Sequence, residues 1–273
     1  MLHCMAKWLL LASLVLASLQ QGEKAPRFSL PGTDGKVYTL EDMRGKLVYL
    51  TFVSETCAPC RQEIPVLNQF YKSKSDSIVI LAIMFGSRKL SKARRTRESM
   101  GIQIPLLYDP SGEIFVRYQV FALPSGFLVS ERGEIIKRYF GFHQQVLIAD
   151  FEREIARLEK LENTCSVFIE KFKESTQAAR MDKSGSFYKD QIEKSLAKDK
   201  FEIASSREKA RFILSGSVSK IQSLTGFSIK TSDMLTGKVI LEQDLSITGS
   251  DLSGLIKEIE EKISNTCQKN QQH

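Results

Sequence analysis

Two unbroken apolar runs, residues 47–53 and 78–85, dominate the first half of the chain. Neither run shows helical spacing, which is typical of strands buried on both faces, as in a parallel sheet covered by helices. Between the runs, apolar residues recur every three or four positions, at Ile64, Leu67, Phe70 and Tyr71. This spacing predicts an amphipathic helix between the two strands.

Shorter elements are predicted before and after this strand–helix–strand unit in the sequence. Residues 28–40 are predicted to form a hairpin, because an Asp34-Gly35 turn stands between alternating apolar residues. The other elements expected here are a short helix ending at Tyr118, strands at 127–129 and 134–140, and an amphipathic helix from about His143 to Glu162.

The pattern changes after Glu162. Two short strands are expected at 165–169 and 201–203, with an amphipathic helix that carries Phe187, Tyr188, Ile192 and Leu196 between them. Three strands of alternating apolar residues follow, within 212–218, 227–229 and 239–247, and a helix at 251–263 closes the chain. This order predicts an α/β sandwich with a mainly antiparallel sheet.

The length of 273 residues is enough for two ordinary domains, which we place at residues 22–162 and 163–267, with a polar tail at 268–273. An apolar content of 42% and a charged content of 26% are those of a globular protein. The net charge of +7 comes without a nucleic-acid-binding motif or interleaved aromatic residues. Nucleic acid is therefore not an expected partner.

The first 21 residues have the three-part pattern of a secretory signal. A positively charged start, residues 1–7, is followed by an apolar run at 8–19 and a polar stretch at 20–23. The run is too short for a comfortable membrane span, which takes about 20 apolar residues. We expect an exported, periplasmic protein, with an uncleaved membrane anchor as the alternative. Cleavage would remove Cys4 and leave four cysteines, enough for two disulfides.

Cys57-Ala58-Pro59-Cys60 lies where the first buried strand meets the amphipathic helix. A helix N-terminus favours an anion, so the Cys57 thiolate is stabilised there and becomes a nucleophile near neutral pH. Cys60 follows one helical turn later, close enough to resolve a mixed disulfide formed at Cys57. The pair is therefore predicted to be redox-active, and this chemistry needs no cofactor.

Cysteines at this spacing also occur in metal sites. A Cys-x-x-Cys can be half of a zinc site, but tetrahedral zinc needs two further ligands at matching spacing. The three histidines, His3, His143 and His273, are scattered singly, so no metal is expected. The remaining alternative is a purely structural pair at a helix start.

Several ordered landmarks resemble the TlpA/ResA-like thiol-disulfide oxidoreductases of the thioredoxin fold. They are the hairpin, the strand before Cys57, Glu63-Ile64-Pro65, Asp109-Pro110-Ser111-Gly112, Leu123-Pro124 and the ending at 127–141. The resemblance covers about residues 23–160 and implies a thioredoxin-like fold. It also implies that Cys57 attacks, Cys60 resolves, Glu63 is the active-site acid and Pro124 is a cis-proline facing the pair. Its expected partners are protein thiols or disulfides and an upstream electron donor, such as a membrane thiol reductase.

Spacing supports the role of Glu63, because it lies one turn beyond Cys60 and could exchange a proton with the Cys60 sulfur. A solvent-facing helix glutamate is the alternative. The chain departs from the family at Thr56, where a tryptophan is usual, and at Glu55, whose negative charge opposes formation of the nearby thiolate.

The second half resembles the CsgG/LpoB/TolB-N-terminal group of envelope domains, through the segment at 211–218, the strand meander and the turn at 235–238. It carries no catalytic motif and is interpreted as a module that binds an envelope protein. Cys165 and Cys267 flank this domain, each after Asn-Thr, and are predicted to form a structural disulfide. Two unpaired thiols at fraying ends are the alternative.

These observations predict an exported thiol-disulfide oxidoreductase, and the family resemblance implies that it reduces partner disulfides. A peroxiredoxin-like thiol peroxidase is one alternative, although residues 51–56 lack the proline that such enzymes carry before the reactive cysteine. The other is a non-catalytic adaptor, which would tolerate the loss of both Cys57 and Cys60.

Overall fold

The computed structural model describes residues 19–85, 89–174, 184–198, 201–221, 224–248 and 252–269. The chain divides into two compact units between Phe151 and Glu152, inside helix α5 (Gln144–Asn163). The predicted domain boundary at 162/163 stays a prediction. Residues 1–18 of the predicted signal segment and residues 270–273 of the predicted tail lie outside the described residues.

The first unit is built on a five-stranded sheet in the order β5-β4-β3-β6-β7. Its strands are β3 (Leu47–Val53), β4 (Ile78–Phe85), β5 (Leu106–Asp109), β6 (Ser125–Val129) and β7 (Ile135–Phe140). All seven residues of β3 are buried, as the apolar run predicts. The sheet is mixed, because β3, β4 and β5 run parallel while β6 and β7 pair antiparallel.

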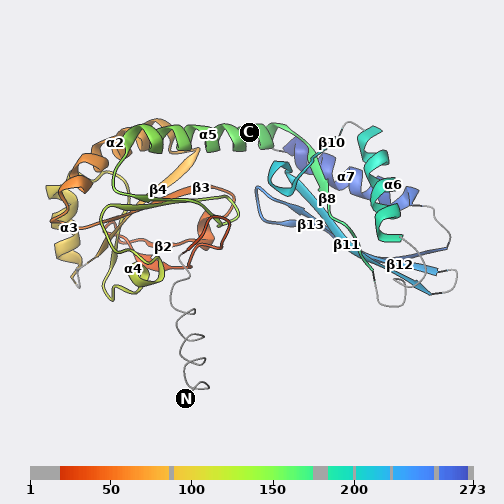
Figure 1. Ribbon diagram of the computed structural model, residues 1–273, viewed down its shortest axis with the longest axis horizontal. Coiled ribbons are helices and arrows are strands. Elements are labelled where there is room, and N and C mark those ends of the chain that lie inside the picture. The colour runs from red at the N-terminus through yellow and green to blue at the C-terminus, as the bar shows by residue number, and fades with distance from the viewer. Residues whose placement is uncertain are drawn as a thin grey trace, which may run out of the picture. The chain divides into compact units, whose positions relative to one another are not determined.

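Helices cover both faces of this sheet. Figure 1 shows α2 (Ala58–Lys74) and the first part of α5 on one face of β3 and β4, and α4 (Glu113–Arg117) on the other. The remaining elements are the hairpin β1 (Ser29–Pro31) and β2 (Val37–Thr39), the turn η1 (Glu41–Met43) and helix α3 (Leu90–Ser99). The predicted hairpin is confirmed, with Gly35 at a φ of 87° in its turn.

Side chains alternate across β3. Val48, Leu50 and Phe52 pack into a core cluster with Ile114 and Phe115 of α4. Tyr49 and Thr51 therefore face the other way, toward α2 and α5, and the Tyr49 ring contacts Phe151 of α5 at 4.9 Å between centroids. This second face holds the polar part of the site described below.

The second unit is an α/β sandwich whose sheet has the order β10-β8-β11-β12-β13. Its strands are β8 (Ser166–Ile169), β9 (Lys173–Glu174), β10 (Glu202–Ile203), β11 (Phe212–Ile221), β12 (Leu224–Asp233) and β13 (Val239–Thr248). The three long strands are antiparallel, which confirms a mainly antiparallel sheet, whereas β8, β9 and β10 pair in parallel. The turn η2 (Arg207–Lys209) precedes β11.

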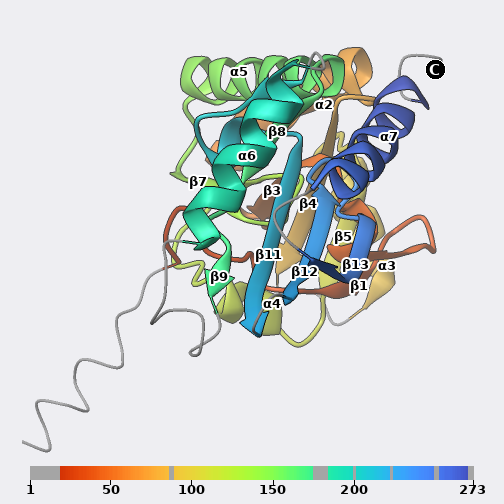
Figure 2. The ribbon, with the colours of Figure 1, turned by 90° about the vertical axis from the view of Figure 1, so that its right-hand side faces the viewer.

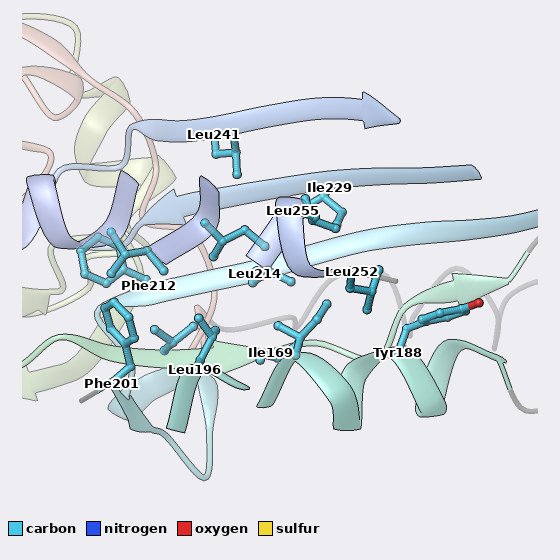
Figure 3. Close-up of a cluster of buried hydrophobic side chains, with 14 of the residues drawn as sticks. Ile169, Tyr188, Leu196, Phe201, Phe212, Leu214, Ile229, Leu241, Leu252 and Leu255 are labelled. Carbon is cyan, nitrogen blue, oxygen red and sulfur yellow. The ribbon is translucent and has the colours of Figure 1, made fainter. Parts of the chain in front are cut away.

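Helices α6 (Ser184–Lys198) and α7 (Ser253–Lys269) lie over one face of this sheet (Figure 2). Side chains from the strands and from both helices meet in one apolar cluster, which includes Ile169, Leu196, Phe212, Leu214 and Leu255 (Figure 3). The predicted helix at 251–263 continues to Lys269, so Cys267 lies within it. Across the described ranges, none of the helices is long and apolar enough to cross a membrane.

Candidate redox site

Cys57 and Cys60 are joined by a disulfide at the start of α2, with their Cα atoms 5.3 Å apart. Cys57 is the N-cap of the helix, in an extended conformation, and its sulfur accepts a hydrogen bond from the Cys60 backbone N–H at 3.2 Å. The cap position has neither Ser, Thr, Asp nor Asn, so the sulfur satisfies a helix N–H that those side chains would otherwise bond. Pro59 lies in the first turn, where a missing N–H costs nothing.

The two sulfur-bearing residues differ in access. Cys60 has no exposed surface, whereas Cys57 is 8% exposed and lines a groove of about 780 Å³. Phe121 is 87% exposed and Val116 76% exposed at this groove. Its other lining residues are Ser54, Thr56, Ala58, Pro59, Gly112, Phe115, Gln119, Val120, Ala122 and Leu123. A sulfur atom entering the groove therefore meets Cys57 before Cys60.

The loop that contains Pro124 lies at the same end of the sheet as the cysteines. Ser125, the next residue, pairs with Phe52 on β3, and β3 ends one residue later, four residues before Cys57. The Leu123–Pro124 peptide bond is cis, and Leu123 lines the groove. The loop thus forms one wall beside Cys57.

Glu63 is a buried member of the site, with only 1% of its surface exposed. Its Oε1 accepts a hydrogen bond from the Tyr49 hydroxyl at 2.9 Å, and its Oε2 accepts one from the Thr51 hydroxyl at 2.8 Å. The solvent-facing alternative is therefore wrong. Burial raises the pKa of Glu63 above its usual value, and the hydrogen bonds from Thr51 and Tyr49 oppose that rise.

The charge of Glu55 is offset in part. Its carboxylate lies 3.9 Å from the Lys92 ammonium in an exposed ion pair, and Arg61 donates to the Glu55 carbonyl at 3.2 Å. Such an exposed ion pair contributes little to stability, because solvent screens it. Among the described residues, no group of three or more His, Cys, Asp or Glu side chains could hold a metal ion.

In the second unit, Cys165 and Cys267 are joined by a disulfide, with Cα atoms 6.1 Å apart. Arg211, whose structural role the sequence analysis did not predict, is fully buried beside them. Its guanidinium donates to the Glu162 carbonyl at 2.9 Å and to the Thr266 carbonyl at 3.4 Å. Arg211 therefore holds together the two segments that carry the cysteines.

Tyr49 and Thr51 are members of the site that the sequence pattern did not predict. Both stand inside the buried run at 47–53, which is interpreted above by its apolar character alone. Their hydroxyl groups are two residues apart, so they share one face of the strand. Two hydroxyl-bearing residues at this spacing, followed by a glutamate on the next helix, were the feature of the sequence that could have identified Tyr49 and Thr51.

Comparison with known proteins finds relatives that are named thiol-disulfide oxidoreductases. A model described as AhpC/TSA family matches residues 21–138. Thiol-disulfide oxidoreductase ResA of Bacillus subtilis (strain 168) is 33% identical over 135 residues, which are 49% of this chain and 75% of that protein. Thioredoxin-like protein YneN of the same strain is 34% identical over 119 residues, 43% of this chain and 69% of YneN. The solved structure of the exposed lipoprotein thioredoxin Etrx1 of Streptococcus pneumoniae strain TIGR4 is 29% identical, with a TM-score of 0.42, and covers 47% of this chain and 99% of its own.

Proposed function

Since the chain belongs to the ResA-like thiol-disulfide oxidoreductases, we propose that it reduces disulfides of partner proteins outside the cytoplasm through Cys57 and Cys60. The observation that carries the proposal is the asymmetry of the pair. Cys57 caps a helix and lines an apolar groove, while Cys60 is buried behind it. This arrangement suits one sulfur for attack from solvent and the other for the internal step that releases the partner.

The reaction begins with the reduced dithiol. The Cys57 thiolate attacks one sulfur of the partner disulfide, forming a mixed disulfide and releasing the other partner sulfur as a thiolate. Cys60 then loses its proton and attacks the Cys57 sulfur, which forms the Cys57–Cys60 bond and breaks the bond to the partner. The partner gains two electrons and leaves as a dithiol, and this chain ends oxidised. A further cycle needs an upstream electron donor, such as a membrane thiol reductase.

Glu63 takes the proton of Cys60 in the second step. The two residues are one turn apart on α2, and both are buried, so bulk water has little access to the thiol. An ionised carboxylate at that position acts as a general base. In the reverse direction its carboxylic acid returns the proton to the Cys60 sulfur.

The rest of the chain supports a proposed location and a proposed class of partner. The signal-like segment at 1–21 supports export to the periplasm, cleaved or retained as an anchor. Two disulfides suit an oxidising compartment. The second unit, which resembles envelope domains and has no catalytic motif, would bind an envelope protein and bring the redox unit to its substrate.

Trapping tests the proposal. Cys60→Ser should accumulate a mixed disulfide between Cys57 and a partner protein, because the release step is lost while attack remains. Cys57→Ser is the matched control and should trap nothing. The proposal fails if Cys57→Ser traps the same partner, or if the reduced wild type does not reduce protein disulfides. Consumption of hydrogen peroxide at a rate above that of disulfide reduction would instead favour the peroxidase.

A further inference from the structure

Both oxygens of the Glu63 carboxylate are held from the neighbouring strand. We propose that Tyr49 and Thr51 are positioning residues that keep Glu63 fixed and ionised for its reaction with Cys60, and that Gly126 provides the space which the Tyr49 hydroxyl needs. The inference rests on the proposed role of Glu63 as the base for Cys60.

The geometry of β3 brings the two hydroxyls to one place. Tyr49 and Thr51 are two residues apart, so both side chains leave the sheet on the face covered by α2. Each donates to a different carboxylate oxygen, at 2.9 Å and 2.8 Å. Because each oxygen has its own donor, the carboxylate of Glu63 cannot rotate without breaking both hydrogen bonds.

Gly126 makes this arrangement possible. It lies opposite Thr51 in the β3–β6 register and opposite Tyr139 in the β6–β7 register. A Cβ atom at this position would stand 2.1 Å from the Tyr49 hydroxyl oxygen and 2.7 Å from the nearest ring carbon. Such a contact is impossible, so any larger residue at 126 has to displace Tyr49.

Tyr49 has little room to move aside. Its ring makes edge contacts with Tyr139, at 5.9 Å between centroids, and with Phe151, at 4.9 Å. Phe151 is itself in contact with Phe70 of α2 at 5.2 Å. These rings fix the direction of the Tyr49 side chain, so displacement by a Cβ at 126 would carry its hydroxyl away from Glu63.

Several titratable side chains among the described residues come from the elements packed around Glu63. Cys60 lies on the same helix as Glu63, Tyr49 comes from β3 and Tyr139 from β7. The Tyr139 hydroxyl donates to Asp150 of α5 at 2.9 Å. Asp150 also forms an ion pair with Lys137 at 2.7 Å, so its negative charge is paired with a cation.

The two hydroxyl groups change the strength of the base. Burial raises the pKa of Glu63, and both hydroxyl donors lower it because they stabilise the charged form. Loss of either donor should therefore raise the pKa of Glu63 further. A smaller fraction of the enzyme then carries the carboxylate at a given acidic pH, and the Cys60 step slows there.

The experiment follows the two steps separately. The reduced full-length protein is mixed with dithiobis-nitrobenzoate, an aromatic disulfide, in a stopped-flow instrument from pH 5 to 9. Attack by Cys57 releases the first nitrothiolate and resolution by Cys60 releases the second, so Cys60→Ser retains only the first phase. In Tyr49→Phe and Thr51→Val, the pH midpoint of the second phase should move upward. Below the midpoint this phase should slow roughly tenfold, because the loss of one hydrogen bond to the charged carboxylate lowers its ionised fraction by about that factor.

Conservative and matched variants test whether a shift of the midpoint comes from the lost hydroxyl group or from a general loss of packing. Thr51→Ser keeps the hydroxyl and should retain the wild-type midpoint, whereas Gly126→Ala should shift it as Tyr49→Phe does. Tyr118→Phe is the control, because Tyr118 is also a buried tyrosine, yet donates to the Pro26 carbonyl at 2.8 Å. Its midpoint should not move.

The Glu63→Gln background separates the two proposals. There, Tyr49→Phe should cause no further change in the second phase. The positioning inference is overturned if Glu63→Gln slows this phase while Tyr49→Phe and Thr51→Val leave its midpoint in place. The proposed function itself is overturned if the wild type shows no second phase.

Discussion

Removal of the Cys165–Cys267 disulfide should destabilise the second unit selectively. The bond closes a loop with a sequence separation of 102 residues, from the start of β8 to the last turns of α7. In the chain-entropy treatment, a loop of about 100 residues restricts the unfolded chain by up to about 4.7 kcal/mol, and measured gains are often smaller. Cys165→Ala/Cys267→Ala should therefore lose a large part of a typical domain stability of about 5–15 kcal/mol.

Hydrogen exchange with mass spectrometry measures this loss for each unit. If exchange proceeds through unfolding of the second unit, a loss of about 4 kcal/mol accelerates it by roughly a factor of a thousand. The acceleration should appear in peptides from β8, β11 and α7, which share the cluster that contains Cys267. Peptides from β3 serve as the internal control, because Cys57 and Cys60 are unchanged.

A matched variant controls for the loss of a disulfide as such. Cys57→Ser/Cys60→Ser removes a bond with a sequence separation of 3, which restricts the unfolded chain far less. It should leave exchange in β11 and α7 unchanged. The reasoning is refuted if Cys165→Ala/Cys267→Ala shows wild-type exchange in these peptides, or if peptide mapping of the wild type finds both cysteines as free thiols.

Two further predictions concern buried charges. The folded-state pKa of Glu63 is raised from the usual 4.5, so the stability that protonated Glu63 contributes is fully present below about pH 4.5 and is lost as pH rises through the folded-state pKa. Denaturant titrations of the oxidised protein at several pH values should show this decline, and Glu63→Gln should abolish it. The same pH dependence of stability in the wild type and in Glu63→Gln would contradict the assignment. Arg211→Met should destabilise the second unit by about 3–5 kcal/mol, because Asp233, 3.9 Å from the guanidinium, is left buried without its ion-pair partner. In urea unfolding, Arg211→Met/Asp233→Asn should recover part of that loss, and full additivity of the two changes would show that the charges are not coupled.

The elements that follow from local patterns were predictable. The run at 47–53 became a fully buried strand, and the Asp34-Gly35 turn became a hairpin. Both depend on periodicity and turn chemistry, which short stretches of sequence contain. The strand β9 was missed because two polar residues, Lys173 and Glu174, show no period, and only pairing with β11 makes them a strand.

The parallel pairing of β8 and β10 could not be predicted from the sequence pattern either. β10 has two residues and β8 has four, so neither carries information about its neighbour or direction. Their arrangement depends on the longer β11, which pairs with β8, and on the helices packed against the sheet. Direction in such short strands is a property of the assembled unit.

Part of the candidate site could likewise be predicted from local sequence, and part could not. Cys57, Cys60 and Glu63 are within seven residues at the start of one helix, so spacing alone brings them together. Tyr49, Thr51 and Gly126 come from two strands, and their relation to Glu63 depends on the register between β3 and β6. A one-residue slip of that register would move Gly126 to the opposite face and put a side chain against Tyr49. The nucleophile and its resolving partner are thus encoded locally, whereas the control of the base depends on how the sheet is assembled.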